Sequence, residues 1–394
     1  MVIKLSSNNV SQYLLNCGIC PKEKLGSLEI ELLELMKINL ESSSNIFISI
    51  PSNSNLVVKQ EYSHHSNVVN NKVLNEWQLH KFLQSCPSLG YSASFVLEIL
   101  LFDRTNSILI YKYPKDYLNL REYYLIHKFF PTEIAKTVGI SLANLHRQTS
   151  ENQECFKFLN KKSKEEKIYK FPFPIYLKDK IAPETFFISP SESIKFLKLY
   201  QSCESLRSVV TKLVADHNHY CLTNNSFGVD NILIPMHWEE LLFKNGQFDK
   251  SLIKVINWDN CSWGDPAFDL GTVIASYFIL WLNSLFLHPA IELEKSLQLA
   301  AIPLERIQPS VLALIKGYIS KFPEILKIYP FFLERIVQFT GLALIYKVIT
   351  MINSFKGFNN QGVFILQLAK TMLCTPEKSF KYVFPNLSDS TLVD

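Results

Sequence analysis

The sequence predicts an α+β fold of two lobes, a small N-terminal lobe built on an antiparallel sheet and a larger, mainly helical C-terminal lobe. Two observations support this prediction. Short β-rich segments, separated by clusters of Ser and Asn, dominate the chain up to residue 113. Beyond that point the longer segments carry apolar residues at helical spacing. We therefore place the N-lobe at residues 1–113 and the C-lobe at residues 114–394.

The N-lobe is expected to contain a short helix over residues 8–16, five strands and one longer helix. The longer helix is predicted over residues 72–84, where Leu74, Trp77 and Phe82 recur at helical spacing. Ser and Asn clusters between apolar, β-branched runs are typical of hairpins. The five strands are expected at residues 32–40, 45–51, 55–62, 93–102 and 107–114.

The C-lobe is expected to be a helical bundle. Residues 131–149 and 192–214 each place apolar side chains on one helix face. Residues 273–287 form the most apolar run, which is shorter than the ~20 residues that a bilayer span requires, so we expect a buried helix. The charged cluster at 161–167 is expected to be a solvated loop, and two prolines exclude a regular helix at 171–174.

Composition narrows the function classes. Apolar residues make up 47% of the chain and charged residues 19%, which is typical of a folded globular protein. The net charge is only +4, on 40 basic and 36 acidic side chains, so composition gives no case for a nucleic-acid surface. The start of the chain lacks the pattern of a signal peptide, and we expect a cytoplasmic protein with no membrane partner.

Cysteine and histidine spacings give weak metal signals. The eight cysteines are scattered, which favours reduced thiols in the cytosol over a disulfide framework. Cys17 and Cys20 form a CxxC pair, and His217 and His219 form an HxH pair, but neither has further ligands at metal spacing. We interpret the cysteine pair as ordinary thiols near a helix end, and the histidine pair as part of a loop or helix end. The alternative is a metal or redox role for the cysteines and a metal role for the histidines.

Two segments of the C-lobe carry a recognisable pattern. They are SFGVDNILI at residues 226–234 and KVINWDNCSWGDPAFDLG at residues 254–271. Together they resemble the catalytic half of the aminoglycoside phosphotransferase and choline kinase group, in which HGDxxxxN precedes IDWxxxxxGDPxxDL. This resemblance implies a protein-kinase-like fold. The positions that match are Asn231, Gly264, Asp265, Pro266, Asp269 and Leu270.

The resemblance also assigns nucleotide-binding positions in the N-lobe. Lys59, in the third strand, would hold the ATP phosphates, braced by Glu76 of the following helix. The alternative is a strand-edge lysine and a helix-surface glutamate that do not touch. Tyr111 and Tyr113 fall at the hinge, where backbone groups usually hold adenine. The phosphate loop is expected at residues 41–45, where Ser43 and Ser44 replace the usual glycines.

Three departures from the pattern fall on positions that carry chemistry. Ser226 stands where the family has its catalytic Asp, and serine is no base near neutral pH. Asn257 stands where a metal-binding Asp is expected, although Asn231, the other metal position, is kept. Asp230 could act as a surrogate base. Asp259 could be a partial metal ligand or an ordinary solvated carboxylate, and both readings stay open.

The segment that matches the family pattern at residues 264–270 is expected to support the fold and not to take part in chemistry. By the resemblance, Asp265 and Asp269 cap helix starts and hold the catalytic loop through its backbone, and Pro266 suits a first helical turn. Gly264 completes this segment. His146 ends an L-x-x-LH pattern and is expected to be structural.

The sequence therefore favours a degenerate member of this group, a pseudokinase with ATP and Mg²⁺ binding weakened or absent. It would act as a binding or scaffolding partner for a protein or peptide, and a setting in ribosomal peptide maturation follows from the family likeness alone. Two alternatives remain. One is an active, atypical ATP-dependent phosphotransferase on a small hydroxyl compound or a Ser/Thr peptide. The other is a nucleotide-binding switch without chemistry.

Overall fold

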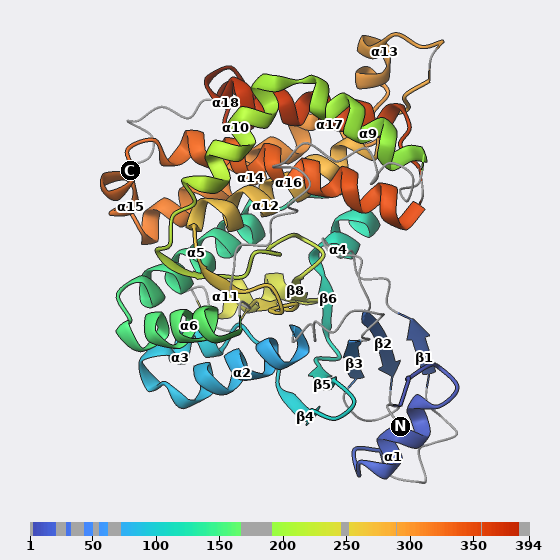
Figure 1. Cartoon of the computed structure of the whole chain (residues 1–394), viewed down its shortest axis with the longest axis vertical. Coiled ribbons are helices and arrows are strands. Elements are labelled where there is room, and N and C mark those ends of the chain that lie inside the picture. Colours follow the sequence, from blue (N-terminus) through green and yellow to red (C-terminus); the bar gives the residue numbers. More distant parts are fainter. Residues whose placement is uncertain are drawn as a thin grey trace.

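The computed structural model describes residues 3–20, 29–32, 43–49, 55–61, 72–166, 191–245, 252–288, 290–355 and 357–385. These residues form a small sheet-containing lobe and a larger helical lobe, as Figure 1 shows. The predicted α+β class with a small sheet lobe and a helical lobe is thereby confirmed.

The N-lobe contains an antiparallel sheet of five strands in the order β1-β2-β3-β5-β4. The register pairs Asn45 with Lys59 and Lys59 with Leu109, so Lys59 lies in the central strand of the sheet. The strands are β1 (Glu29–Leu32), β2 (Ser43–Ser49), β3 (Asn55–Glu61), β4 (Ile99–Asp103) and β5 (Ile108–Tyr113).

Strands β3 and β5 of this sheet are largely buried on both faces, which pack against different helices. Alternate residues of a strand point to opposite faces. Leu56 and Val58 of β3 therefore join the cluster around helix α1 (Val10–Asn16). Val57, between them, joins the cluster with Val73 of helix α2 (Lys72–Ser85). This second face is the one that turns towards the C-lobe, since Leu233 belongs to the same cluster.

Several predicted boundaries in the N-lobe were wrong. The strand expected at 93–102 begins only at Ile99, because residues 87–93 form a 3₁₀ turn, η2 (Pro87–Leu89), followed by a short helix, α3 (Gly90–Ala93). Ser94 closes this helix by donating its hydroxyl to the carbonyl of Tyr91. The strand expected at 32–40 is described only at β1, and residues 33–40 lie outside the described part.

Two predictions in the C-lobe also needed correction. The charged cluster expected as a loop at 161–167 continues helix α6 (Gln153–Glu166) as far as residue 166, since Lys and Glu are good helix formers, and residue 167 lies outside the described part. The single helix expected at 192–214 is two helices, α9 (Ser191–Ser202) and α10 (Glu204–Ala215), separated by the extended backbone of Cys203. Residues 171–174 lie outside the described part.

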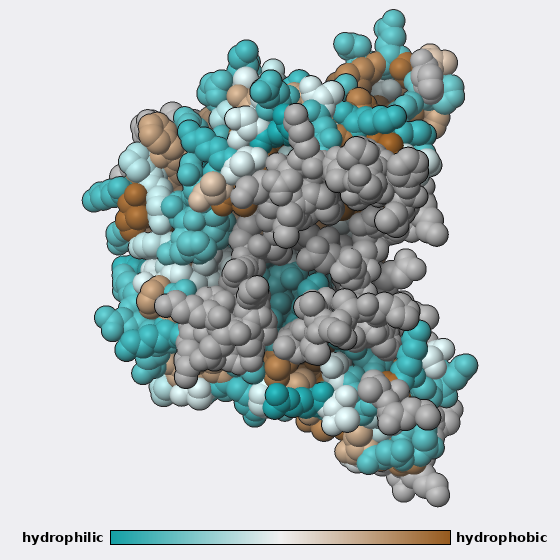
Figure 2. All heavy atoms as spheres, viewed as in Figure 1, coloured by the Kyte–Doolittle hydropathy of each residue, from teal (hydrophilic) through white to brown (hydrophobic). Residues whose placement is uncertain are grey.

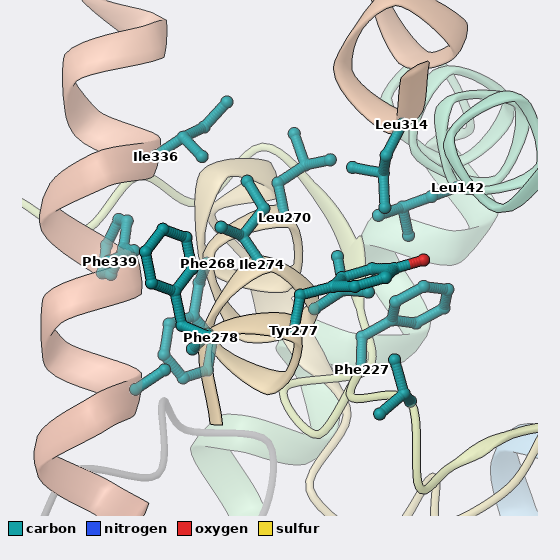
Figure 3. Close-up of a cluster of buried hydrophobic side chains, with 14 of the residues drawn as sticks. Leu142, Phe227, Phe268, Leu270, Ile274, Tyr277, Phe278, Leu314, Ile336 and Phe339 are labelled. Atoms are coloured by element: carbon teal, nitrogen blue, oxygen red, sulfur yellow. The ribbon is translucent and has the colours of Figure 1, made fainter. Parts of the chain in front are cut away.

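The C-lobe core surrounds helix α12 (Pro266–Leu282), which confirms a buried helix within the apolar run and ends it at Asn283. Figure 3 shows Phe268, Ile274 and Phe278 of α12 among side chains of the neighbouring helices. Those neighbours are α5 (Thr132–Ser150), α14 (Leu304–Lys321) and α16 (Phe332–Phe355). Helix α17 (Asn360–Cys374) also contacts α12, through the rings of Phe364 and Trp281.

Helices α5 and α14 approach closely because each places a glycine at the contact. A Cβ added at Gly139 would lie 2.0 Å from the carbonyl oxygen of Leu314, and one added at Gly317 would lie 2.5 Å from that of Lys136. Real Cβ atoms do not approach oxygen so closely, so any larger residue would push the two helices apart. This packing fixes the position of α5, and with it that of His146, which contacts Asp269 of α12.

Helix α16 is long and apolar enough to cross a membrane over Phe332–Ile352, but 72% of its most apolar window is buried inside the protein. It contacts α12 and α17, as a core helix does. On the surface, brown side chains gather over α13 (Leu293–Gln298) at the upper right of Figure 2, where Leu293, Leu297 and Leu299 are exposed.

Two small sheets frame the segment between residues 221 and 264. Strand β7 (Cys221–Thr223) pairs with β10 (Ser262–Gly264), and β8 (Ile232–Pro235) lies between β6 (Tyr117–Asn119) and β9 (Lys254–Val255). Asn257 and Asp259, in the loop between β9 and β10, reach Lys59 of the N-lobe sheet. The remaining helices are α4 (Leu120–His127), α11 (Trp238–Asn245), α15 (Ile325–Ile328) and α18 (Pro376–Val383).

Candidate active site between the lobes

Lys59 and Glu76 form a buried ion pair on the face of the N-lobe sheet that turns to the C-lobe. The Lys59 Nζ lies 2.6 Å from Glu76 Oε2, and the two side chains are 2% and 1% exposed. The other carboxylate oxygen of Glu76 accepts a hydrogen bond of 2.9 Å from the backbone N–H of Trp258. The expected contact is therefore present, and the alternative of two separate surface residues is excluded.

Asp259 joins this pair from the C-lobe. Its Oδ2 lies 3.1 Å from Lys59 Nζ, and its side chain is 13% exposed. Burial alone lowers the pKa of Lys59, but the negative charges of Asp259 and Glu76 raise that pKa above its ordinary value. Lys59 is thus a firmly charged ammonium. Asp259 is half-buried and ion-paired, which excludes the reading of an ordinary solvated carboxylate.

The two positions that the resemblance assigns to a metal ion meet through their side-chain amides. Asn257 Nδ2 donates a hydrogen bond of 2.7 Å to Asn231 Oδ1, and Asn257 Oδ1 accepts one of 3.4 Å from Lys59. Asn257 has φ near 59°, a left-handed conformation that Asn tolerates better than most residues. Both amide oxygens thus face N–H donors.

This donor set does not fit a magnesium ion as it is arranged. Mg²⁺ prefers anionic oxygen in near-octahedral geometry. The acid beside the two amides, Asp259, is held by Lys59, and no cluster of three or more acidic, His or Cys side chains stands in the described part of the chain. Asn231 Oδ1, Asn257 Oδ1 and Asp259 Oδ2 are thus each engaged by an N–H group or by the Lys59 ammonium.

Ser226 lies in the loop between β7 and β8, where the family's catalytic Asp would be. Its side chain is buried, and its hydroxyl accepts a hydrogen bond of 3.3 Å from Asn260 Nδ2. Its carbonyl accepts one of 2.7 Å from Asn231 Nδ2. Ser226 and Asn231 thus lie together, joined by the side-chain amide of Asn231 and the backbone carbonyl of Ser226, where the family pattern would have a carboxylate at position 226.

The expectation that Asp269 caps a helix start was wrong, because Asp269 lies inside α12. Asp269 instead holds the loop between β7 and β8, the counterpart of the family's catalytic loop, by accepting N–H groups of the loop backbone. The two carboxylate oxygens accept the N–H groups of Asn224 and Asn225, each at 2.8 Å. His146 Nε2 lies 3.3 Å from the same carboxylate, and its Nδ1 lies 3.0 Å from the hydroxyl of Tyr318. His146 therefore positions Asp269 from the buried side of the loop.

Asp265 caps helix α12 by accepting the N–H of Ala267 at 3.0 Å, and Pro266 is the first residue of that helix. Arg335 of α16 forms an ion pair of 2.6 Å with the same carboxylate. Burial raises the pKa of Asp265, and Arg335 opposes that rise. A Cβ at Gly264 would meet Thr223 Oγ1 at 2.3 Å, so only glycine fits between β10 and β7.

A cavity of ≈ 260 Å³ lies between the lobes. Val57 and Lys59 of β3 line it from the N-lobe, and Leu233, Ile256 and Asn257 line it from the C-lobe. The predicted hinge residues, Tyr111 and Tyr113, also line it. Apolar walls beside a buried lysine are typical of a small-molecule pocket.

The turn expected at residues 41–45 has different bounds in the structure, because Ser43 and Ser44 begin strand β2 and pair with Glu61 and Gln60 of β3. The assignment of these two serines to a phosphate loop stays a prediction. Residues 41 and 42 and the side chains of Ser43 and Ser44 lie outside the described part.

Asp230 lies at the end of the catalytic loop and lines two cavities, the cleft and a second pocket in the C-lobe. Its Oδ1 is 3.5 Å from Arg121 Nε of α4. Burial raises the pKa of Asp230, although Arg121 and Lys347 oppose this. Sequence reasoning missed Arg121, Lys347, Arg335 and Asn260, because the first three lie outside the recognised segments and Asn260 stands at one of the variable positions of the pattern.

The weak metal signals have structural explanations. His217 Nε2 accepts the backbone N–H of Asp265 at 3.3 Å, and His219 Nδ1 lies 2.9 Å from the carbonyl of Trp263. Cys17 ends helix α1, and Cys20 is buried against the same sheet face. These four residues therefore support the two lobes.

A sheet lobe, a helical lobe, a Lys–Glu pair and a loop held by Asp269 define the class: this chain has a protein-kinase-like fold. Among solved structures it is similar to an ethanolamine kinase from Plasmodium vivax, with a TM-score of 0.53 and 13% identity over 96% of this chain and 93% of the other. This likeness supports the fold that the sequence resemblance to choline kinases implied.

Other similar structures carry related names. A choline/ethanolamine kinase family protein from Mesorhizobium loti has a TM-score of 0.44 and 13% identity, covering 90% of this chain and 91% of its own. An amicoumacin kinase has a TM-score of 0.46 and 12% identity, covering 96% and 98%. No protein-family model and no curated protein matches the sequence.

Proposed function

We propose that this chain is a kinase-fold protein that binds a nucleotide in the cleft but transfers phosphate poorly or not at all. One observation carries the proposal. The side-chain amide of Asn257 donates to Asn231 Oδ1, so the two positions expected to hold a metal ion instead hold each other. In a kinase of this fold, the metal neutralises charge on the transferring phosphate.

The lack of a base at Ser226 supports the same proposal. In phosphotransferases of this fold a carboxylate accepts the proton of the attacking hydroxyl, and a positioned acid or base contributes about 10²–10⁴ in rate. A serine hydroxyl that accepts a hydrogen bond from Asn260 offers no such group. Two independent changes thus weaken the same reaction.

Nucleotide binding itself is supported by the cleft. The cavity is lined by apolar side chains and by the charged Lys59, which Glu76 and Asp259 hold in place. A nucleotide that binds only the folded protein raises its apparent stability. The physiological role would then be to bind a protein or peptide partner in the cytosol, with peptide maturation as one setting.

The test is a thermal-unfolding titration with ATP, with and without Mg²⁺, beside an assay of phosphate release. We expect stabilisation by ATP that does not require Mg²⁺ and no phosphate release above background. The Lys59→Met variant should lose the stabilisation by ATP, whereas Lys198→Met, at an exposed position of α9, should keep it. Phosphate moved onto any acceptor faster than by Lys59→Met would overturn the proposal.

The competing function is an active, atypical phosphotransferase, and the position of Asp230 favours it. Asp230 borders both the cleft and the C-lobe pocket, and burial raises its pKa, which suits a base. The test is to compare Asp230→Asn and Asp259→Asn with the native chain. If turnover exists, this alternative requires that one of these changes abolishes it while Ser226→Ala does not.

A further inference from the structure

The second pocket in the C-lobe has a charge pattern that selects its ligand. It has a volume of ≈ 80 Å³ and lies between the catalytic loop, α4, α12 and α16. Among the described residues that line it, Arg121 and Lys347 are positive and Asp230 is negative. These three charges leave one net positive charge in the pocket.

The neutral polar groups of the pocket do not change this balance. The hydroxyls of Thr272, Ser276 and Thr350 each donate to a carbonyl of their own helix, at 2.8, 2.6 and 2.9 Å. The walls between them are apolar, with Ala275, Ile279 and Leu280 of α12. The charged side chains are therefore the groups that decide which ligand the pocket favours.

Burial makes these charges matter more than they would in water. Within the described lining, Asp230 is the single carboxylate that faces both cations: its Oδ1 lies 3.5 Å from Arg121 Nε, its side chain is 22% exposed, and its negative charge raises the pKa of Lys347 as well. Burial lowers the pKa of Lys347 to about 8, so the ammonium is still mostly protonated at neutral pH. Burial makes the excess positive charge unfavourable, and an anion placed beside Lys347 would compensate it.

We propose that this pocket binds a small anionic molecule, one that carries a carboxylate or a phosphate group, with Lys347 and Arg121 as its anchors. The inference rests on the proposed function only in treating the pocket beside the catalytic loop as a ligand site. A cationic ligand such as choline is not expected to bind, because the net positive charge of the pocket lining would repel it. An apolar wall formed by α12 would accommodate a short carbon chain on the anion.

The experiment is calorimetric titration of the full chain without nucleotide, so that its outcome is independent of phosphate transfer. The probes are O-phospho-L-serine, D-glycerate, inorganic phosphate and choline. We expect one or more of the three anions to bind and choline not to bind. Inorganic phosphate binding without D-glycerate would mark a phosphate site, and the reverse a carboxylate site. Choline binding as tightly as the anions, or no binding of any of the three anions, would overturn the proposal.

Variants of the native chain identify the anchor. Lys347→Met should weaken anion binding by at least about tenfold, whereas Lys316→Met, at an exposed position of α14, should leave it unchanged. If Lys347→Met fails to fold, as judged by circular dichroism, Arg121→Gln provides the second test, with a similar loss expected. Unchanged anion affinity in the folded Lys347→Met or Arg121→Gln protein would refute the assignment.

Discussion

Glu76 joins the two lobes through Trp258. One carboxylate oxygen of Glu76 holds Lys59 at 2.6 Å, and the other accepts the backbone N–H of Trp258 at 2.9 Å. Helix α2, the central strand of the N-lobe and the C-lobe loop are thereby tied to one side chain. The pair that resembles a nucleotide anchor is therefore also a structural element of the fold.

The first prediction concerns Lys59. Lys59→Met leaves Glu76 and Asp259 facing each other without the ammonium between them, and removing one partner of a buried ion pair costs about 3–5 kcal/mol. We expect the free energy of unfolding to fall by that amount in urea denaturation. Lys198→Met, on the exposed face of α9, should change it by no more than about 0.5 kcal/mol. Equal stabilities of the two variants would contradict the buried pair.

The second prediction concerns Asp269. Asp269→Asn places an N–H group opposite the N–H of Asn224 or Asn225, so one buried donor loses its acceptor. We expect a loss of about 3 kcal/mol and faster hydrogen exchange at residues 224 and 225. Asp116→Asn, at an exposed position before β6, is the matched control and should leave both quantities unchanged. If hydrogen exchange at residues 224 and 225 is as slow in Asp269→Asn as in the native chain, the loop does not depend on the carboxylate of Asp269 for its order.

The resemblance to kinases implied the contact of Lys59 with Glu76 and the support of the loop by Asp269, and the structure shows both. Sequence reasoning failed at Ser43, where Ser and Asn favour a turn but strand pairing with β3 prevails. It failed again at Cys203, where nothing in the local pattern indicates a break between two helices.

The rest of the site could not be predicted, because it depends on tertiary packing. Arg335 reaches Asp265 from α16, 70 residues further along the chain. Arg121, Asp230 and Lys347 come together only because α4 and α16 pack beside the catalytic loop. None of these residues has a local signal beyond its charge, so only the folded arrangement shows their relationship.

The third prediction concerns pH. Burial lowers the pKa of His80 to about 4, whereas the same side chain in the unfolded chain titrates near 6.5. Between these values the unfolded state binds the extra proton, so stability is present above pH 6.5 and falls as the pH drops, by up to about 1.4 kcal/mol per pH unit. His80→Phe should flatten this slope in denaturation curves, and His237→Phe, which changes an exposed histidine, should not. A slope that is the same in His80→Phe and the native chain would disprove the assignment.

The fourth prediction concerns the amide pair. Asn257→Asp replaces the N–H that faces Asn231 Oδ1 with an anionic oxygen, the ligand that Mg²⁺ prefers. Without metal the new carboxylate faces the oxygen of Asn231, so the variant should be slightly less stable than the native chain. With Mg²⁺ and ATP it should gain stability, and its affinity for the Mg–ATP complex should exceed the native affinity by at least about tenfold.

The control for Asn257→Asp is Asn144→Asp on helix α5, which adds the same charge away from the residues that line the cleft. Thermal unfolding with ATP, with and without Mg²⁺, measures all three proteins. The decisive quantity is the difference that Mg²⁺ makes, because a general effect of added charge would appear equally in Asn144→Asp. The native chain could instead gain as much stability from Mg²⁺ as Asn257→Asp does. This result would mean that the side-chain amide of Asn257 rotates and presents its oxygen to the metal ion. The hydrogen bond to Asn231 would then be no obstacle to a metal ion, and the proposal of impaired phosphate transfer would depend on Ser226 alone.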